Sequence, residues 1–473
     1  MINLHNESHR KMIAKFIQSE QYRLEYNHDI FKILEGNLKE ILETRMNVDL
    51  GKSSFDQAVT RIAPINIFKK IVTKQTAIYN QTVIRTVENG NEADEKLLRW
   101  YEDVLNINQK LHRNNAFFNA YLHALLQITL TDVNPMTGMG KPFLRTAPNH
   151  QFLVMSTSQV DPTSPDVIIL IMPDVVDALG KIDRCFYVCT NYQFVIMNLE
   201  GEVHSDEMAR HGQEGINPYG TTPFIHNNAS ENLSMPMVQT DNREMAVLIP
   251  LLLTDLNYAV KFQAFSTFVA IDCDESEVKM SPRSIMHFKS DANGNHPSFD
   301  VVKPTIDISE TLSLASSQMS LWLTSKGIRP GTVGQLGADQ FSSGVSKMIE
   351  ESDIYESVKE QITVYEQCEK TFWQKLFKQI HPFWIAARRV ENTTPFSPGA
   401  SVKVTYTKPK PLQSRLDMIK ELALEVESGF TTVETAVRKL NPEMEQKAID
   451  DLISEAKAEL IDRRPMQPLQ LAN

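Results

Sequence analysis

The chain has 473 residues, of which 42% are hydrophobic and 23% are charged. These proportions are typical of a folded globular protein and exclude a disordered, collagen-like or membrane-spanning chain. The formal net charge of −11 argues against a surface that grips nucleic-acid phosphates tightly, although DNA could still pass by it.

The sequence carries no sign of secretion or of membrane insertion. Its longest apolar stretches, Val167 to Met172 and Val247 to Leu253, are far shorter than the roughly 20 residues of a membrane-spanning helix. The first residues lack the apolar segment of a secretory signal. Four cysteines are too few for a disulfide framework in a chain of this length. We therefore expect cytosolic synthesis, a reduced compartment and no membrane.

The first half of the chain is expected to combine helices with a β-rich layer. Apolar residues recur at helical spacing over residues 1–86 and again over 91–130, where the run FFNAYLHALLQITL extends one long helix or two. Short β-type runs separated by Pro, Asn and Asp follow over residues 141–203. The segment NPYGTTPFIHNNAS, which begins at Asn217, is rich in turn residues and predicts a loop.

A long helix is predicted over residues 241–266. Asp241 and Glu244 have the spacing of an N-terminal capping box, and apolar residues then recur on one face. A helix of this length is a rod of roughly 39 Å. Pro250 marks either the true first turn or a kink.

A small β module and a second helix follow. Residues 267–305 contain three strand-like pieces and the turn signal Asn293-Gly294. The next helix is predicted over residues 306–323, where Asp307 and Glu310 repeat the capping-box spacing. The module is too small to fold alone, so we expect it to be held between the two helices.

A glycine-rich loop leads into the clearest helical pattern in the chain. Five glycines lie between residues 327 and 344, and such a composition disfavours regular structure. Residues 343–380 then keep one apolar stripe, which predicts a helix of about 57 Å. A strand at 402–407 follows. Short helices are expected to begin near residues 414, 431 and 441, before a flexible tail.

This order of elements resembles that of phage portal proteins. NPYGTTPFIHNNAS resembles the loop before their first stem helix, and SKGIRPGTVGQLGADQFSSGVSKMIEE resembles their tunnel loop as it enters a long helix. GFTTVETAVRKLNPEMEQKAIDDLISEAKAEL resembles their crown. The resemblance spans residues 91–460 and indicates no role for residues 1–90. The expected fold is α+β, predominantly helical, with wing, stem, clip and crown regions.

The resemblance assigns the regions as follows: 1–240, N-terminal helical region and wing with the β layer; 241–266, first stem helix; 267–305, clip; 306–323, second stem helix; 324–342, tunnel loop; 343–412, long wing helix and return strand; 413–473, crown and C-terminal tail. It implies a ring of twelve copies at one capsid vertex. The implied partners are the major capsid protein, a scaffolding protein, the terminase large subunit, and adaptor, head-completion or tail proteins. The ring would belong to the virion and would assemble in the bacterial cytoplasm, with no enzymatic activity and no cofactor.

The implied role agrees with the charge of the chain. Twelve copies with a net charge of −11 each would carry −132 formal charges, which would repel the phosphate backbone. Double-stranded DNA would then slide through without sequence specificity. The expected tunnel-loop residues are Lys326, Gly327, Arg329, Gly331, Gln335 and Gln340, and Lys326 and Arg329 could touch phosphates transiently. The expected partner-docking residues of the clip are Asp274, Glu275, Lys279, Arg283 and Lys289.

Other interpretations of the same residues stay open. The glycine-rich loop lacks the Gly-Lys-Ser/Thr ending of a nucleotide-binding loop and could also be a plain solvent connector. Cys185 and Cys189 have no partner pair at zinc spacing, so we expect them to be core residues. The aromatic pairs Phe372-Trp373 and Phe383-Trp384 favour core or subunit packing over base stacking.

Two other functions remain as alternatives. One is a metal-dependent nuclease or hydrolase with a dispersed active site, which would draw on the acidic run at residues 272–277 and on His204, His211 and His226. The other is a monomeric helical adaptor that binds a partner through the long helix.

Overall fold

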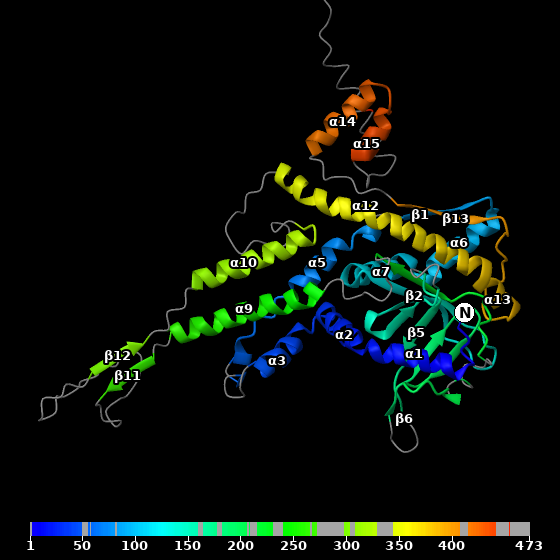
Figure 1. Ribbon diagram of the computed structural model, residues 1–473. Coiled ribbons are helices and arrows are strands. Elements are labelled where there is room, and N and C mark those ends of the chain that lie inside the picture. Colours follow the sequence, from blue (N-terminus) through cyan, green and yellow to red (C-terminus); the bar gives the residue numbers. More distant parts are fainter. Residues whose placement is uncertain are drawn as a thin grey trace, which may run out of the picture. The chain divides into compact units, whose positions relative to one another are not determined.

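The computed structural model describes residues 2–49, 55–56, 58–80, 83–158, 164–176, 182–205, 208, 215–229, 240–264, 267–271, 298–302, 308–328, 344–406, 415–440 and 454. It is a mixed α+β structure in which helices form the larger part of the described residues (Figure 1). The chain divides into two compact units: residues 1–338 with 356–408, and residues 339–355 with 409–473. No helix among the described residues is long and apolar enough to cross a membrane.

The N-terminal segment is helical, as the spacing of its apolar residues predicts. Its elements are α1 (Glu7–Ser19), α2 (Gln21–Glu35), α3 (Leu38–Asp49) and α5 (Ile67–Gln75), with single 3-10 turns at Val59–Arg61 and Ile78–Asn80. The Asn6 side chain accepts a hydrogen bond from Ser8 N and caps α1. Gly36, at φ +102°, ends α2 in the left-handed conformation that glycine tolerates. Ile13 and Ile17 of α1 are buried in one cluster with strand residues such as Val167.

Antiparallel strands form the predicted β-rich layer. A four-stranded sheet has the order β4-β5-β8-β9, with bounds Phe152–Met155, Val167–Ile171, Phe186–Cys189 and Phe194–Met197. A three-stranded sheet has the order β10-β2-β3, with bounds Phe224–Asn228, His123–Thr131 and Lys141–Ala147. Three two-stranded pairs join β1 (Val83–Glu88) to β13 (Ser401–Tyr406), β6 (Val175–Val176) to β7 (Ile182–Asp183), and β11 (Thr267–Ile271) to β12 (Ser298–Val302).

The helical prediction for residues 91–130 was partly wrong. Two helices, α6 (Glu92–Leu105) and α7 (Ile107–Tyr121), are present, but the run ALLQITL belongs to strand β2. The chain leaves α7 through Leu122, which has φ +60°. Strand β2 pairs with β3 on one side and β10 on the other. These ladders supply the backbone hydrogen bonds of the segment and override its helix-like spacing.

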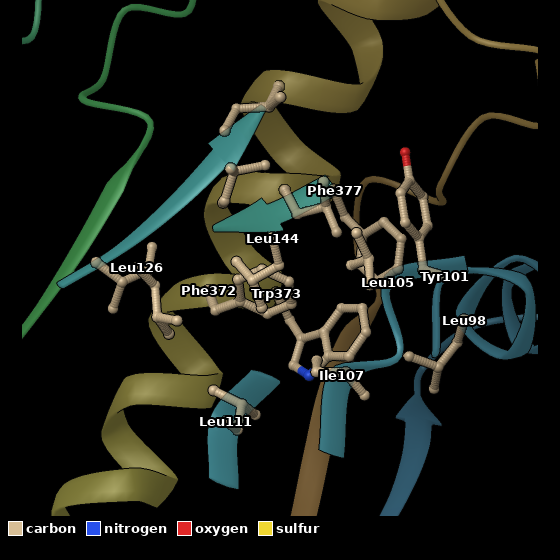
Figure 2. Packing of buried hydrophobic residues seen from close by; sticks show 14 of the residues in the cluster. Leu98, Tyr101, Leu105, Ile107, Leu111, Leu126, Leu144, Phe372, Trp373 and Phe377 are labelled. Atoms are coloured by element: carbon tan, nitrogen blue, oxygen red, sulfur yellow. The ribbon is translucent and has the colours of Figure 1, made fainter. Parts of the chain in front are cut away.

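One buried cluster joins the two predicted layers. It contains residues of α6 and α7, of β2 and β3, and of α12 (Gly344–Lys375). Figure 2 shows the side chains of Phe372, Trp373 and Phe377 among Leu126 of β2 and Leu144 of β3. The sheet and the long helix therefore share one core.

The helix predicted over residues 343–380 is present but continues further. A π-helical turn (Leu376–Ile380) follows α12, and α13 (His381–Ala386) follows the turn directly. The turn shifts the hydrogen-bond ladder, so that His381 N donates to Leu376 O. Pro382, which has no N–H to donate, then lies in the first turn of α13.

Two further helices flank the small β pair. They are α9 (Thr240–Ala264), which contains Pro250 in its interior, and α10 (Ile308–Ser325). Of the three expected strand-like pieces, two form the β11–β12 pair, and residues 272–297 lie outside the described part of the chain. In the second unit, α14 (Arg415–Glu427) packs against α15 (Val433–Leu440). The helix expected near residue 441 lies outside the described residues.

Candidate functional site

The candidate site is the antiparallel pair of helices α9 and α10 with the strands β11 and β12 at their far ends (Figure 1). We call these four elements the helix-pair projection. At 1.5 Å per residue, α9 is about 38 Å long and α10 about 27 Å long. Since each strand follows or precedes one helix directly in the chain, the helices set the position of the β pair.

The first turns of α9 are held by polar contacts with the N-terminal helices and α7. The Arg243 guanidinium lies 2.7 Å from Asp29 Oδ2 and 5.3 Å from the centre of the Tyr26 ring. The Asn242 amide donates to Ala120 O at 3.3 Å. The helix is therefore fixed at its base, before it leaves the core.

The Thr254 hydroxyl, one turn after Pro250, connects α9 to the N-terminal part of the chain. The Thr254 hydroxyl donates to Pro250 O at 2.7 Å and accepts from Ala63 N at 3.1 Å. Thr254 is buried. The side chain thus adds a bond to the helix one turn after the proline and ties α9 to the chain at Ala63.

The end of α10 is anchored to α5. Trp322 is buried and stacks on Phe68, with ring centroids 6.3 Å apart. The Gln75 side chain donates to Lys326 O at 3.2 Å. The exit of the helix-pair projection is therefore fixed at the core, as its entry is.

One face of α10 is exposed and carries no charge. Residues 311–325 contain no Asp, Glu, Lys or Arg. Leu314 is 51% exposed and Leu321 is 72% exposed, and Ser313 and Ser317 lie beside them at helical spacing. We call these four residues the uncharged face. Leu314 and Leu321 expose apolar surface to water on one side of the helix. Burial of this surface against another surface would be favourable.

The residues that the sequence predicted for the tunnel loop are only partly described. Lys326 is partly buried and follows α10. Gly327 has φ +66°, and Ile328 N donates to Leu323 O at 2.9 Å, which is the hydrogen-bond pattern of a glycine helix cap. Gly327 therefore ends α10, a role that the sequence analysis did not assign to it.

The other predicted site residues lie outside the described residues. In the loop these are Arg329, Gly331, Gln335 and Gln340. In the segment expected to be a clip they are Asp274, Glu275, Lys279, Arg283 and Lys289. Their assignments stay predictions.

The residues behind the enzyme alternative are not gathered into one centre in the described part of the chain. There, no group of three or more His, Cys, Asp or Glu side chains is placed to hold a metal ion. His204 lies in an irregular segment after β9 and His226 lies on β10, while His211 and residues 272–277 are outside the described residues.

The predicted core residues are in the core. Cys185 and Cys189 are buried free thiols, and burial raises the pKa of Cys189 to about 12. Phe372, Trp373 and Trp384 are also buried, which confirms packing for these aromatic residues.

A second polar site, which the sequence did not predict, lies beside strand β10. There the Lys375 ammonium of α12 donates to Phe224 O at 2.7 Å and to Thr222 O at 3.1 Å. An open pocket of about 510 Å³ lies next to it. The sequence gives little signal for this place, because Lys375 looks like one more polar residue between the apolar positions of a long helix.

The chain has a distant structural similarity to a solved structure. A solved structure of the neck of an empty GTA particle, computed with C6 symmetry, aligns with 80% of this chain and 89% of that chain, at 9% sequence identity and a TM-score of 0.40. A likeness this distant supports no conclusion about function. No protein-family model and no curated protein matches the sequence.

Proposed function

We propose that this chain is a portal protein, the subunit of a ring at one capsid vertex of a tailed phage. The ring would be the channel through which DNA is packaged and ejected. It would bind the terminase large subunit during packaging, and adaptor, head-completion or tail proteins afterwards. In this role the chain catalyses nothing and carries no cofactor, and the ring becomes part of the virion after assembly in the bacterial cytoplasm.

The helix-pair projection carries the proposal. Two helices fixed at their bases hold a β pair away from the core, and α10 leads into a glycine-rich segment and then α12. This is the order of stem, clip, stem, tunnel loop and wing helix in the family that the sequence resembles. Leu314 and Leu321 of this projection stay exposed within one chain, and the packing of copies in a ring would cover them.

The uncharged face supports assembly in particular. Leu314 and Leu321 would each gain from leaving water by packing against a neighbouring copy. A face without charges also makes no ion pairs with DNA phosphates. Together with the net charge of −11 per chain, it favours a ring past which DNA slides.

Electron microscopy of the purified full-length chain, combined with native mass spectrometry, tests the proposal. We expect rings with a central hole and about twelve subunits. The double variant Leu314→Ser/Leu321→Ser should assemble poorly while keeping its helical circular dichroism. Met136→Ser is the control, because Met136 is 93% exposed in the turn after β2, outside the helix-pair projection.

A compact monomer under all conditions would contradict the proposal. In that case nuclease activity with added Mg²⁺ or Mn²⁺ would support the enzyme alternative. A monomer without nuclease activity would support the helical-adaptor alternative.

A further inference from the structure

Strand β10 has one free edge. In the sheet order β10-β2-β3, β10 pairs only with β2 among the described residues. An edge strand presents unpaired N–H and C=O groups that can pair with another chain. This inference concerns that edge and is independent of the proposed function.

The register shows which residues face the free edge. Ile128 N donates to Pro223 O, and Ala229 N donates to Leu122 O, each at 2.9 Å. Because antiparallel pairing alternates, the backbone groups of Ile225 and Asn227 also point toward β2. Those of Thr222, Phe224 and His226 therefore point away from β2. The hydrogen bonds from Lys375 Nζ to Thr222 O and Phe224 O agree with this.

His226 leaves two backbone groups unpaired on this side. Lys375 occupies the carbonyls at the start of the strand, but His226 N and His226 O have no hydrogen-bond partner among the described residues. The two groups belong to one residue and face the same way, so a second extended chain could bond both.

The free edge borders a pocket of suitable size. The pocket of about 510 Å³ is lined by β10, by residues of α12 such as Gln367 and Thr371, and by the start of β5 near Ile168. This volume is within the range of known ligand pockets. The pocket lies along β10, in the position that an added strand would occupy.

The charge of the residues that line the pocket indicates the chemical class of its ligand. Lys375 lines it, whereas no Asp or Glu does among the described residues. The three N–H groups of the Lys375 ammonium donate to neutral acceptors, the Thr222 and Phe224 carbonyls and the Thr222 hydroxyl, and burial lowers the pKa of Lys375 to about 8. At neutral pH it is a partly buried cation that pairs with no carboxylate among the described residues, in a chain whose net charge is negative.

We propose that this groove binds an extended acidic peptide of a partner protein, which adds to β10 as a further strand. A carboxylate of the peptide would replace the Thr222 hydroxyl, 3.2 Å from Lys375 Nζ, as one of the three acceptors of the ammonium. The backbone of His226 would supply one donor and one acceptor to the peptide. Main-chain pairing would give affinity, and the carboxylate would give selectivity.

The test uses the full-length chain and the labelled peptide Thr-Val-Thr-Glu-Thr-Val-Thr, followed by fluorescence anisotropy. We expect saturable binding and slower hydrogen exchange of the His226 amide. A peptide with Lys in place of Glu should bind roughly tenfold more weakly, the ratio expected for one charge-assisted hydrogen bond. A peptide with alternate backbone nitrogens methylated should not bind.

Two variants of one residue isolate the backbone contribution. His226→Ala and His226→Pro both remove the imidazole, but only proline removes the N–H that faces the free edge, where the β10–β2 ladder does not need it. Peptide binding should persist in the alanine variant and be lost in the proline variant, with similar thermal unfolding of the two. Lys375→Met should abolish the preference for Glu over Lys.

Three results would overturn the proposal. They are no saturable binding of the Glu peptide, equal binding by the alanine and proline variants, or binding that leaves the His226 amide exchange unchanged. Any of these would mean that Lys375 only shields the free edge from aggregation.

Discussion

Two buried arginines, in different regions of the larger unit, have opposite surroundings. Arg85 of β1 is 1% exposed and has acceptors on all three nitrogens. Its Nε and Nη2 donate to Glu369 at 2.6 and 2.9 Å, and Nη1 donates to Asn108 and to Glu102. Glu369 also accepts from the Tyr406 hydroxyl at 2.7 Å. Burial alone would lower the pKa of Arg85, but the Glu369 carboxylate raises it above its ordinary value.

Arg23 of α2 is 4% exposed but much less satisfied. Its Nε lies 2.6 Å from a carboxylate oxygen of Glu20, the residue that precedes α2, whereas Nη1 and Nη2 have no hydrogen-bond partner among the described residues. Burial lowers the pKa of Arg23. Burial and then the charge of Arg23 lower the pKa of His226 to about 4, and burial, His226 and Arg23 hold the pKa of His123 well below 6.5.

The surroundings of the two arginines give the two regions different responses to pH. The ion pair between Arg85 and Glu369 joins β1 to α12. Because the two residues are 284 positions apart in the chain, the pair exists only in the folded state. The Arg23 ion pair joins residues three positions apart at the start of α2, beside strand histidines whose pKa is lowered by burial. The first region stabilises the core over a wide pH range, and the second is sensitive to acid.

The largest effect should come from breaking the Arg85 ion pair. Arg85→Met leaves Glu369 charged and buried, so it should lower the free energy of unfolding by about 3–5 kcal/mol. Urea denaturation followed by tryptophan fluorescence measures the loss. The double variant Arg85→Met/Glu369→Leu is the control, since removing both charges should restore most of the stability. A double variant as unstable as the single one would show that the network, and not the orphaned charge, sets the cost.

Acid should act through the second region. The folded pKa of His226, about 4, lies below its unfolded value near 6.5, so the unfolded chain binds more protons between these values. The resulting stability is present above pH 6.5 and is lost as the pH falls toward 4. The loss between pH 7 and pH 5 should be about 2 kcal/mol.

Denaturation at several pH values, compared between wild type and His226→Gln, measures this loss. The variant lacks the titrating group, so its stability should fall less over the same range. Parallel curves for the two proteins would show that His226 does not titrate in this window.

Much of the helical architecture could be predicted from the sequence. The spacing of apolar residues located α9, α10 and α12 to within a few residues of their observed bounds. These elements are visible because their signal is local: a repeat of 3.6 residues. The third expected piece of the β module and the loop and clip assignments remain predictions, because those residues are not described.

Long-range pairings could not be predicted. The β1–β13 pair joins residues such as Val83 and Tyr406, and no local pattern marks such partners. Glu369 looks like an ordinary charged helix residue until Arg85 is brought against it. Strand β2 was misread for the same reason, since its partners β3 and β10, and not its own spacing, decide its conformation.

The smallest effect should come from Arg23. Its partner Glu20 remains partly exposed, so water can solvate the carboxylate when Arg23→Met removes the cation, and the loss of stability should be about 1 kcal/mol. The same change removes a positive charge beside His226 and should raise the pKa of His226 toward 6.5, which weakens the acid dependence of stability. Urea denaturation at pH 7 and pH 5, with an NMR titration of His226, measures both effects. A loss as large as that of Arg85→Met would mean that the two buried arginines are equivalent after all.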